Sequence, residues 1–347
     1  MKQSNWGNAV TLKEVALEAG VSIPAVSKVL HGRGDTIRVS PEKAGKIREA
    51  AARLKYTPNA LARSLRSSRS HNVGLVFEHF GRLSAGPQYY VHLLDGIATE
   101  LFKSHYRLTS LPEVPHSQVG TILQDGRLDG VIWCKLSDDP GLVSELSSCT
   151  FPIVALNSPF ASTSDLCFIS CDNQGGVLLA VDHLIALGHQ RILFVMEEEE
   201  TETPDALARL EGMKAAMKLR GLRFTEDDIV CWDLGASGFE DWYARETEHT
   251  AVIAWNEGVA GGIIDQARLL KVRIPDQLSV VGFDSTPYCD STVPKLSAVC
   301  QPILKMAQAA TRHLLDLIEG NSTSTESIKF PCTFDAREST GPVHPRT

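Results

Sequence analysis

Hydrophobic positions along the chain change their spacing near residue 72. Before that point, apolar residues recur at intervals of three and four, as they do on the buried face of a helix. After it, short continuous apolar runs alternate with longer stretches that keep the helical spacing. Continuous apolar strands separated by helices predict parallel sheets covered on both faces. The pattern therefore predicts an all-α N-terminal part followed by an α/β body.

The N-terminal part contains three short helical segments. The first begins at Thr11, which has the form of a capping box with Glu14, and ends at Gly20, where the chain must turn. The second is predicted over Ile23–Leu30, and the third begins at Ser40. Two helices joined by a glycine turn and braced by a third predict a helix-turn-helix, whose second helix enters the major groove of DNA.

The second helix has an apolar face and an outward face. Lys28 on the outward face suits guanine O6 or N7, or alternatively a phosphate, and Ile23 suits a thymine methyl or partial packing inside the domain. The predicted DNA-binding residues of this part are the outward positions and the residues at the helix starts: Thr11, Ser22, Ile23, Pro24, Ala25, Ser27 and Lys28.

The segment 57–71 combines an isolated turn of helix with a polar, basic linker. Such a turn is too short to be stable in water and would order only on binding. A basic segment with a protruding leucine is suited to insertion into the minor groove. The DNA contacts predicted in this segment are Asn59, Ala62, Arg63, Leu65 and Arg66.

The runs TLKEVALEAGVSIPAVSKVL, YTPNALARSLR and HNVGLVF resemble the lactose-repressor (LacI) family of bacterial regulators, and the resemblance covers nearly the whole chain. In that family, residues matching Ile23, Pro24 and Lys28 approach base edges. The residue matching Leu65 wedges into the central step of a palindromic operator, beside a hinge helix shaped by those matching Asn59, Ala62 and Arg63. Ile-Pro-Ala at 23–25 replaces a more polar run common in the family, so the operator sequence does not follow from the resemblance.

The body is predicted to contain more strands than one sheet holds comfortably, so we expect two lobes with a ligand at the carboxyl ends of the strands between them. The predicted strands are 73–77, 107–111, 130–134, 153–156, 192–195, 229–232, 251–254 and 278–282. Helices are predicted between them, for example over 89–102, 175–187, 206–220 and 259–270.

The resemblance also implies a body like the periplasmic sugar-binding proteins, with two lobes linked by crossover strands. It implies effector contacts at Tyr89, Tyr90, Asn157, Arg209, Asn256 and Asp284. Asn157 and Glu257 each stand at a position where the family often has aspartate. Because of these two differences, the ligand of a family member does not transfer to this chain. Three alternatives remain open: Asp284 caps the following turn, Arg209 pairs with the acidic run 197–200 on the surface, and the two tyrosines are packing residues.

The charge of the chain is divided unevenly. The net charge is −8, but residues 1–71 hold 13 Lys and Arg against five Asp and Glu, a net of +8. The remaining residues hold 21 against 37, a net of −16. A basic N-terminal block on an acidic body is typical of a DNA-binding part joined to a domain that does not bind DNA.

Several classes of protein are disfavoured. No run approaches the ~20 apolar residues of a membrane span, and the first ten residues lack the apolar core of a secretory signal, so we expect a cytoplasmic protein. None of the eight cysteines forms a C-x-x-C pair, and no metal or other cofactor is expected. The two rival interpretations, a cytoplasmic α/β enzyme and a solute-binding protein of sugar metabolism, do not account for residues 11–66.

The expected organisation is a tail (1–10), a helix-turn-helix domain (11–56), a hinge helix and linker (57–71), a two-lobed effector-binding domain (72–340) and a C-terminal tail (341–347). The expected function is sequence-specific regulation of transcription. As the resemblance implies, a homodimer binds a palindromic double-stranded operator and represses, under the control of a sugar-like small molecule.

Overall fold

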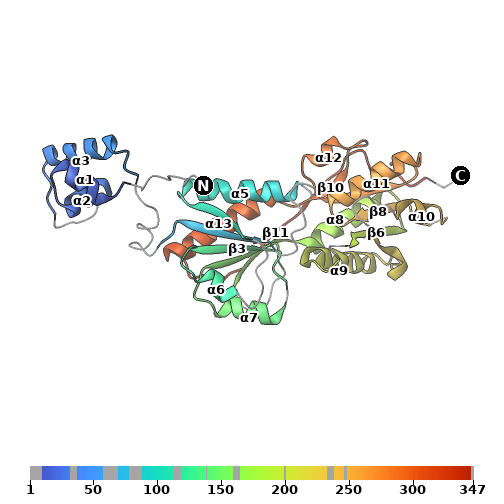
Figure 1. The fold of residues 1–347 in the computed structure, drawn as a ribbon. Coiled ribbons are helices and arrows are strands. Elements are labelled where there is room, and N and C mark those ends of the chain that lie inside the picture. The colour runs from blue at the N-terminus through green and yellow to red at the C-terminus, as the bar shows by residue number, and fades with distance from the viewer. Residues whose placement is uncertain are drawn as a thin grey trace, which may run out of the picture. The chain divides into compact units, whose positions relative to one another are not determined.

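Figure 1 shows the chain in the computed structural model, which describes residues 10–31, 37–57, 69–77, 88–111, 119–137, 139–158, 165–198, 201–232, 238–245 and 248–344. It divides into two compact units, Met1–Ser70 and His71–Thr347. The predicted DNA contacts Asn59, Ala62, Arg63, Leu65 and Arg66 lie outside the described residues.

The N-terminal unit contains the three predicted helices, α1 (Leu12–Ala19), α2 (Ile23–His31) and α3 (Pro41–Arg53). The capping box at the start of α1 is confirmed. The amide of Glu14 donates to Thr11 Oγ1 at 3.3 Å, and the amide of Thr11 donates to Glu14 Oε2 at 2.7 Å. Gly20 ends α1 with a φ of 62°, a left-handed conformation that glycine adopts without steric cost. This turn directs the chain into α2, as the sequence predicts.

The three helices of this unit enclose a small core of their own. Its buried members are Val15, Ala16, Val26, Ile47, Ala50 and Ala51. Ala25, predicted to face outward, is half-buried and packs against this core, as Val29 and Leu30 do. The apolar face of α2 is therefore wider than the sequence pattern suggests.

The second unit contains two sheets, which define two lobes. Among the described residues, the sheet of lobe 1 has six parallel strands in the order β11 (Ile328–Phe330), β5 (Cys167–Cys171), β4 (Ile153–Leu156), β3 (Gly130–Cys134), β1 (Asn72–Phe77) and β2 (Arg107–Leu111). The sheet of lobe 2 has the order β12 (Thr333–Asp335), β10 (Ser297–Cys300), β9 (Ser279–Asp284), β8 (Ala251–Ala254), β6 (Ile192–Glu197) and β7 (Ile229–Trp232). Among the described strands of this sheet, only β12 is antiparallel to its neighbour.

Helices cover both faces of each sheet, as expected for parallel strands (Figure 1). In lobe 1, one face carries α5 (Tyr89–Lys103) and α13 (Ile303–Glu319), and the other carries α6 (Val119–Leu123) and α7 (Pro140–Ser148). In lobe 2, α8 (Asn173–Ala186) and α9 (Pro204–Leu219) pack together, and α10 (Phe239–Tyr243), α11 (Glu257–Leu269) and α12 (Tyr288–Ser291) lie on the opposite face. A 3₁₀ turn, η3 (Glu226–Asp228), precedes β7. In the described part of the chain, no helix is long and apolar enough to cross a membrane.

Three crossovers join the lobes. The chain passes from β5 to α8, returns from β10 to α13, and crosses again between β11 and β12. The eight predicted strands are confirmed within two residues at each end, but β5, β10, β11 and β12 were not predicted. The last two have only three residues each and are partly exposed, so they carry no continuous apolar run. The unpredicted strands are the ones at the crossovers.

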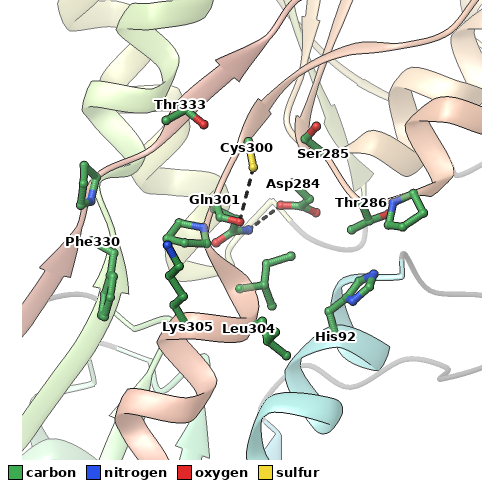
Figure 2. Close-up of a pocket in the computed structure, with 14 residues that line it drawn as sticks. His92, Asp284, Ser285, Thr286, Cys300, Gln301, Leu304, Lys305, Phe330 and Thr333 are labelled. Atoms are coloured by element: carbon green, nitrogen blue, oxygen red, sulfur yellow. Dashed lines mark hydrogen bonds between the residues drawn. The ribbon is translucent and has the colours of Figure 1, made fainter.

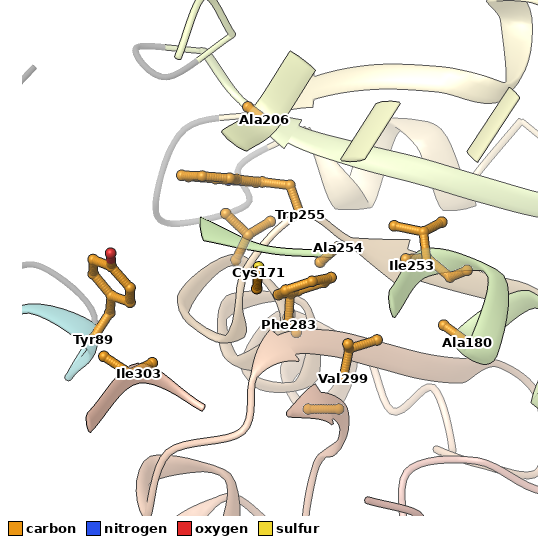
Figure 3. Close-up of a cluster of buried hydrophobic side chains, with 14 of the residues drawn as sticks. Tyr89, Cys171, Ala180, Ala206, Ile253, Ala254, Trp255, Phe283, Val299 and Ile303 are labelled. Carbon is orange, nitrogen blue, oxygen red and sulfur yellow. The ribbon is translucent and has the colours of Figure 1, made fainter. Parts of the chain in front are cut away.

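A single buried hydrophobic cluster continues from one lobe into the other. Figure 3 shows part of it, with Tyr89 and Ile303 from lobe 1 and Trp255 and Phe283 from lobe 2. A separate cluster in lobe 1 lies beneath α6 and α7. The shared cluster places aromatic side chains where the two lobes meet.

We expect Gly96→Ala to destabilise lobe 1, because a Cβ at this position of α5 would lie 2.6 Å from the Cβ of Ala307 and 2.9 Å from the carbonyl oxygen of Leu304 in α13. Overpacking of this kind costs about 1–3 kcal/mol. Gly120→Ala in α6 is the control, because its Cβ meets no atom closer than 3.7 Å and alanine favours the helix by up to about 1 kcal/mol. Urea unfolding of both variants measures the difference, and equal free energies of unfolding would contradict the close packing of α5 on α13.

Candidate functional site

The polar residues between the lobes stand where strands end. Lys135 follows β3, Asn157 follows β4, Asp284 ends β9, and Trp255 and Asn256 follow β8. Lys135, Asn157 and Asp284 all have positive φ, at 57°, 54° and 93°. Non-glycine residues adopt this conformation rarely, and it is concentrated at functional sites. These turns direct the side chains to the carboxyl edges of the two sheets, where ligands bind in this architecture.

Arg209 lies at the centre of the site and is only 1% exposed. From the second turn of α9, its Nε donates to Asn173 Oδ1 at 3.0 Å, and its Nη1 donates to the backbone carbonyl of Trp255. Its Nη2 lies 3.5 Å from Asp284 Oδ1 and 3.8 Å from Asp205 Oδ2. Arg209 therefore does not pair with the acidic run 197–200 on the surface, which was one alternative from the sequence.

The buried charges of the site perturb one another. Burial alone would raise the pKa of Asp205, but Lys135 and Arg209 outweigh it and hold that pKa below its ordinary value. Burial raises the pKa of Asp284 despite the nearby guanidinium of Arg209. Burial would lower the pKa of Arg209, but Asp284 and Asp205 outweigh it and raise that pKa. Asp205 is thus the carboxylate held most firmly in its ionised form.

Lys135 is a buried charged residue that lobe 1 contributes. It is 4% exposed, and its Nζ lies 3.6 Å from Asp205 Oδ1, so this ion pair joins the two lobes. The same ammonium group lies 5.7 Å from the ring centroid of Tyr90 and 5.4 Å from that of Trp255. Contacts of this kind with aromatic faces stabilise a buried cation.

Several buried polar atoms of the site have no hydrogen-bond partner among the described residues. They are the hydroxyl of Tyr89, both amide atoms of Asn157, Asp205 Oδ1, Arg209 Nη2, Trp255 Nε1 and Gln301 Oε1. Buried polar groups in folded proteins are nearly always hydrogen-bonded, because an unpaired one costs free energy. Their concentration between the lobes makes this cleft the candidate binding site for a polar molecule.

Asp284 and Gln301 line a second part of the site, at the crossover side. Figure 2 shows the Gln301 amide directed toward Asp284, to whose Oδ1 its Nε2 donates at 2.5 Å. They border a pocket of about 550 Å³ whose walls include Ile303 at the start of α13 and Phe330 at the end of β11. Because Asp284 contacts both Arg209 and Gln301, it does not merely cap the turn that follows it, the alternative left open by the sequence.

Glu257 holds the loop that follows Asp284. It is fully buried, and its carboxylate accepts hydrogen bonds from the amide of Thr286 at 2.8 Å, from the Thr286 hydroxyl at 2.5 Å and from the Cys289 thiol at 3.3 Å. Burial, with a further contribution from Asp284, raises its pKa to about 7. The neighbouring Asn256 caps α11, since its Oδ1 accepts from the amide of Val259 at 2.8 Å.

The structure brings most of the predicted cleft residues together. Arg209 and Asp284 are in direct contact, Tyr89 and Tyr90 pack edge to face at 5.3 Å, and Tyr90 lies against Lys135. Asn157 is buried at a strand end, whereas the Oδ1 of the buried Asn256 is occupied by its capping role. In the part of the chain that is described, no group of His, Cys, Asp or Glu is placed to hold a metal ion.

Four residues of the cleft were missed from the sequence: Lys135, Asp205, Trp255 and Gln301. Lys135 and Trp255 directly follow predicted strands, so applying the strand-end rule to every strand would have found them. Asp205 stands one helical turn before Arg209, a spacing that brings two side chains together. Gln301 follows β10, which the sequence did not reveal.

The N-terminal unit exposes most of the predicted DNA-binding face. Thr11, Ser22 and Pro24 are exposed, and Ile23 is 44% exposed even though it is a large apolar residue. Ser27 and Lys28 are half-buried. An exposed isoleucine at the start of a recognition helix is suited to contact with a thymine methyl, in agreement with the outward orientation predicted from the sequence.

A helix-turn-helix unit joined to a two-lobed α/β domain with a polar cleft defines a ligand-responsive DNA-binding regulator. Comparison with known proteins agrees. The family of bacterial regulatory proteins of the lacI type matches residues 11–59, and the periplasmic binding protein-like domain matches residues 181–340. The transcriptional regulator AscG of Escherichia coli (strain K12) is 31% identical over 94% of this chain and 96% of its own length. The chain therefore belongs to the LacI family of bacterial transcriptional regulators and is not an enzyme.

Two solved structures are similar over most of the chain. A complex of the regulator CelR with cellobiose is 26% identical, with a TM-score of 0.69, over 95% of this chain and 99% of that one. A lac repressor dimer bound to operator and the anti-inducer ONPF has a TM-score of 0.82 at 22% identity, over 96% and 100% of the two chains. The second likeness shows the fold of the chain.

The raised pKa of Glu257 predicts a pH-dependent stability. The folded protein binds this proton more tightly than the unfolded chain, where the ordinary pKa is 4.5, so the stabilisation is complete below pH 4.5 and is lost as pH rises through 7. In the unaltered protein, we expect the free energy of unfolding to fall on the order of 3 kcal/mol over this range because of Glu257. Glu257→Gln has no titrating carboxyl at this position, so we expect this fall to be absent. Urea unfolding at a series of pH values measures it. The exposed Glu211→Gln is the control, and a Glu257→Gln profile as steep as that of the unaltered protein would contradict the burial effect.

Proposed function

We propose that this chain is a repressor that binds a palindromic operator as a homodimer and responds to a sugar-like molecule held between the lobes of its body. The observation that carries the proposal is the group of buried, unpaired polar atoms that meet in the cleft of a chain whose N-terminal residues match the lacI helix-turn-helix family. The proposed division is residues 11–56 for the helix-turn-helix domain, 57–71 for the hinge and 72–340 for the effector domain.

The unpaired atoms include both hydrogen-bond donors and acceptors. Arg209 Nη2 and Trp255 Nε1 only donate, Asp205 Oδ1 and Gln301 Oε1 only accept, and Asn157 offers one of each. A hydroxyl group donates one hydrogen bond and accepts two, so a molecule carrying several hydroxyls satisfies such a mixture. Trp255 and Tyr90 add aromatic faces for the C–H side of a sugar ring. The cellobiose bound to the similar regulator CelR supports a sugar as the ligand class.

The proposed DNA contacts are those predicted from the sequence, with α2 in the major groove. The residues Asn59, Ala62, Arg63, Leu65 and Arg66 are proposed to form a hinge in the minor groove. A two-fold symmetric dimer fits a palindromic site, and the lac repressor of similar fold is a dimer on its operator. The site of action is proposed to be the cytoplasm, because a bacterial regulator must reach the chromosome.

Ligand binding and operator binding are coupled through the lobes. The cleft residues come from both lobes, with Lys135 on one side and Asp205 and Arg209 on the other. A ligand that contacts both sides favours one lobe angle over others, and that difference in free energy must change operator affinity reciprocally.

The experiment that tests the proposal is selection of bound sequences from random duplex DNA by the full chain, repeated with a panel of sugars. A palindromic motif whose enrichment changes with one sugar supports both parts of the proposal. A motif unaffected by every sugar would sink the effector claim, and the absence of any motif under all conditions would sink the regulator claim for this chain.

We expect Arg209→Met to abolish the response to the sugar while operator binding without sugar stays within about threefold of the unaltered protein. The reason is that Arg209 lies in the cleft, whereas the DNA contacts lie in another unit. Operator titration by fluorescence anisotropy with and without sugar measures both. Arg220→Met, which removes an exposed ion pair with Asp182, is the control and should respond normally. A full sugar response in Arg209→Met would rule out its role in binding.

Operator affinity should fall steeply with salt, because the N-terminal block carries a net charge of +8 that displaces counterions from phosphates. Anisotropy titrations at several salt concentrations give the slope of log affinity against log salt. If Lys28 contacts a phosphate, Lys28→Ala reduces the slope by about one and weakens all sequences alike; if it reads guanine, specificity falls at one base pair instead. A flat salt response would contradict the basic DNA-binding surface.

A further inference from the structure

We propose that the Lys135–Asp205 ion pair between the lobes sets the charge of the effector, so that the cleft selects uncharged polyhydroxylated sugars and rejects sugar acids and sugar phosphates. This inference rests on the proposed function, because it assumes that a sugar binds in this cleft. It goes further by naming the chemical class of the sugar and the two residues that select it.

The Lys135–Asp205 pair is buried within the cleft. Lys135 and Asp205 are each only 4% exposed, and they come from different lobes, after β3 and in the first turn of α9. Two charges this deeply buried are costly to hold unless each has a partner. Asp205 has Arg209 as a second partner, at 3.8 Å, and Lys135 has the faces of Tyr90 and Trp255.

The charges of four buried residues in the described cleft cancel. Two cations, Lys135 and Arg209, meet two carboxylates, Asp205 and Asp284, with nitrogen–oxygen distances of 3.5–3.8 Å. Glu257 lies behind Asp284 and faces Thr286, so any charge it carries is a further negative one. A ligand carboxylate or phosphate would place an additional anion in this buried set, in which each of the two cations already has a carboxylate partner. Lys305, which lines the pocket beside Asp284, is exposed and lies outside the buried set. A neutral ligand leaves the balance unchanged.

A hydroxyl group fits the pair better than an anion does. The Lys135–Asp205 distance of 3.6 Å is longer than a hydrogen bond, and Asp205 Oδ1 has no hydrogen-bond partner among the described residues. One hydroxyl can accept from the ammonium group of Lys135 and donate to Asp205 Oδ1 at the same time, which connects the lobes through the ligand. A carboxylate or phosphate oxygen only accepts, so it would face Asp205 with no proton to share.

The test compares neutral sugars with close relatives that carry a charge. The ligands are glucose, galactose and cellobiose, the acids glucuronate and galacturonate, glucose 6-phosphate, and glucosamine. Binding to the full-length protein is followed by calorimetry and by tryptophan fluorescence, to which Trp255 in the cleft contributes with four other tryptophans. We expect a neutral sugar to bind at least about tenfold more tightly than its own acid or phosphate, a ratio that corresponds to one buried charge left without a partner.

Charge variants make the test specific to the pair. Asp205→Asn leaves an excess positive charge in the cleft and should shift the neutral-to-acid ratio at least about tenfold toward the acid. Lys135→Met leaves an excess negative charge and should shift binding toward glucosamine. Lys214→Met and Asp182→Asn change partly exposed charges on α9 and α8 and should leave the ratio unchanged. Thermal unfolding verifies that each variant is folded. If a variant does not fold, the comparison of sugars with the unaltered protein still tests the charge rule.

The outcomes separate this inference from the proposed function. Equal or tighter binding of an acid or phosphate to the unaltered protein would overturn the charge rule and leave the sugar response standing. A neutral preference that neither charge variant alters would show that other residues set it, and would overturn the role of the pair. Failure of every sugar to bind would overturn the proposed sugar response and this inference with it.

Discussion

The body of this protein is organised around one buried guanidinium. Arg209 is almost completely removed from water, and a charge in that position is tolerated only if carboxylates and carbonyl oxygens replace its hydration. Its partners are Asn173 at the first crossover, the backbone of Trp255 at the end of β8, Asp284 at the end of β9, and Asp205 on its own helix. Because all four must stay within reach of one group, the carboxyl edge of the lobe 2 sheet has a defined geometry before any ligand arrives.

Lobe 1 joins this arrangement mainly through Lys135 and the aromatic residues at the start of α5. The ion pair with Asp205 and the continuous hydrophobic cluster connect the lobes across the cleft, while three short crossovers connect them along the chain. The proposed ligand would therefore lie among the contacts that join the two lobes. That is the physical requirement for a regulator in which a small molecule changes affinity for DNA at a separate domain.

Much of the fold was predictable from the sequence, and the limits have physical causes. The capping box of Thr11 and Glu14 and the left-handed turn at Gly20 are local, so their residue types alone reveal them. Eight strands were found, most of them from continuous apolar runs, although β2 and β7 are partly exposed. β5 and β10 are buried and were missed. β11 and β12 are only three residues long and lie at sheet edges, where exposure removes the apolar signal. Ala25 was predicted to face outward but packs against the core, because a small residue can lie on either face of a helix and its type does not reveal which.

The sequence by itself determined the regulator class, the helix-turn-helix and the parallel α/β body, and its resemblance to the family pointed to Arg209 and Asp284. The first three follow from motifs or from spacing within a few residues. Only the tertiary structure decided that Lys135 meets Asp205, seventy positions away, and that Gln301 meets Asp284. Those contacts depend on the strand order within each sheet and on the crossovers that bring the carboxyl ends of the strands of both sheets to the same cleft. Side chains distant in the sequence become neighbours only when the sheets are assembled, so the charge balance of the cleft has no local signal in the sequence.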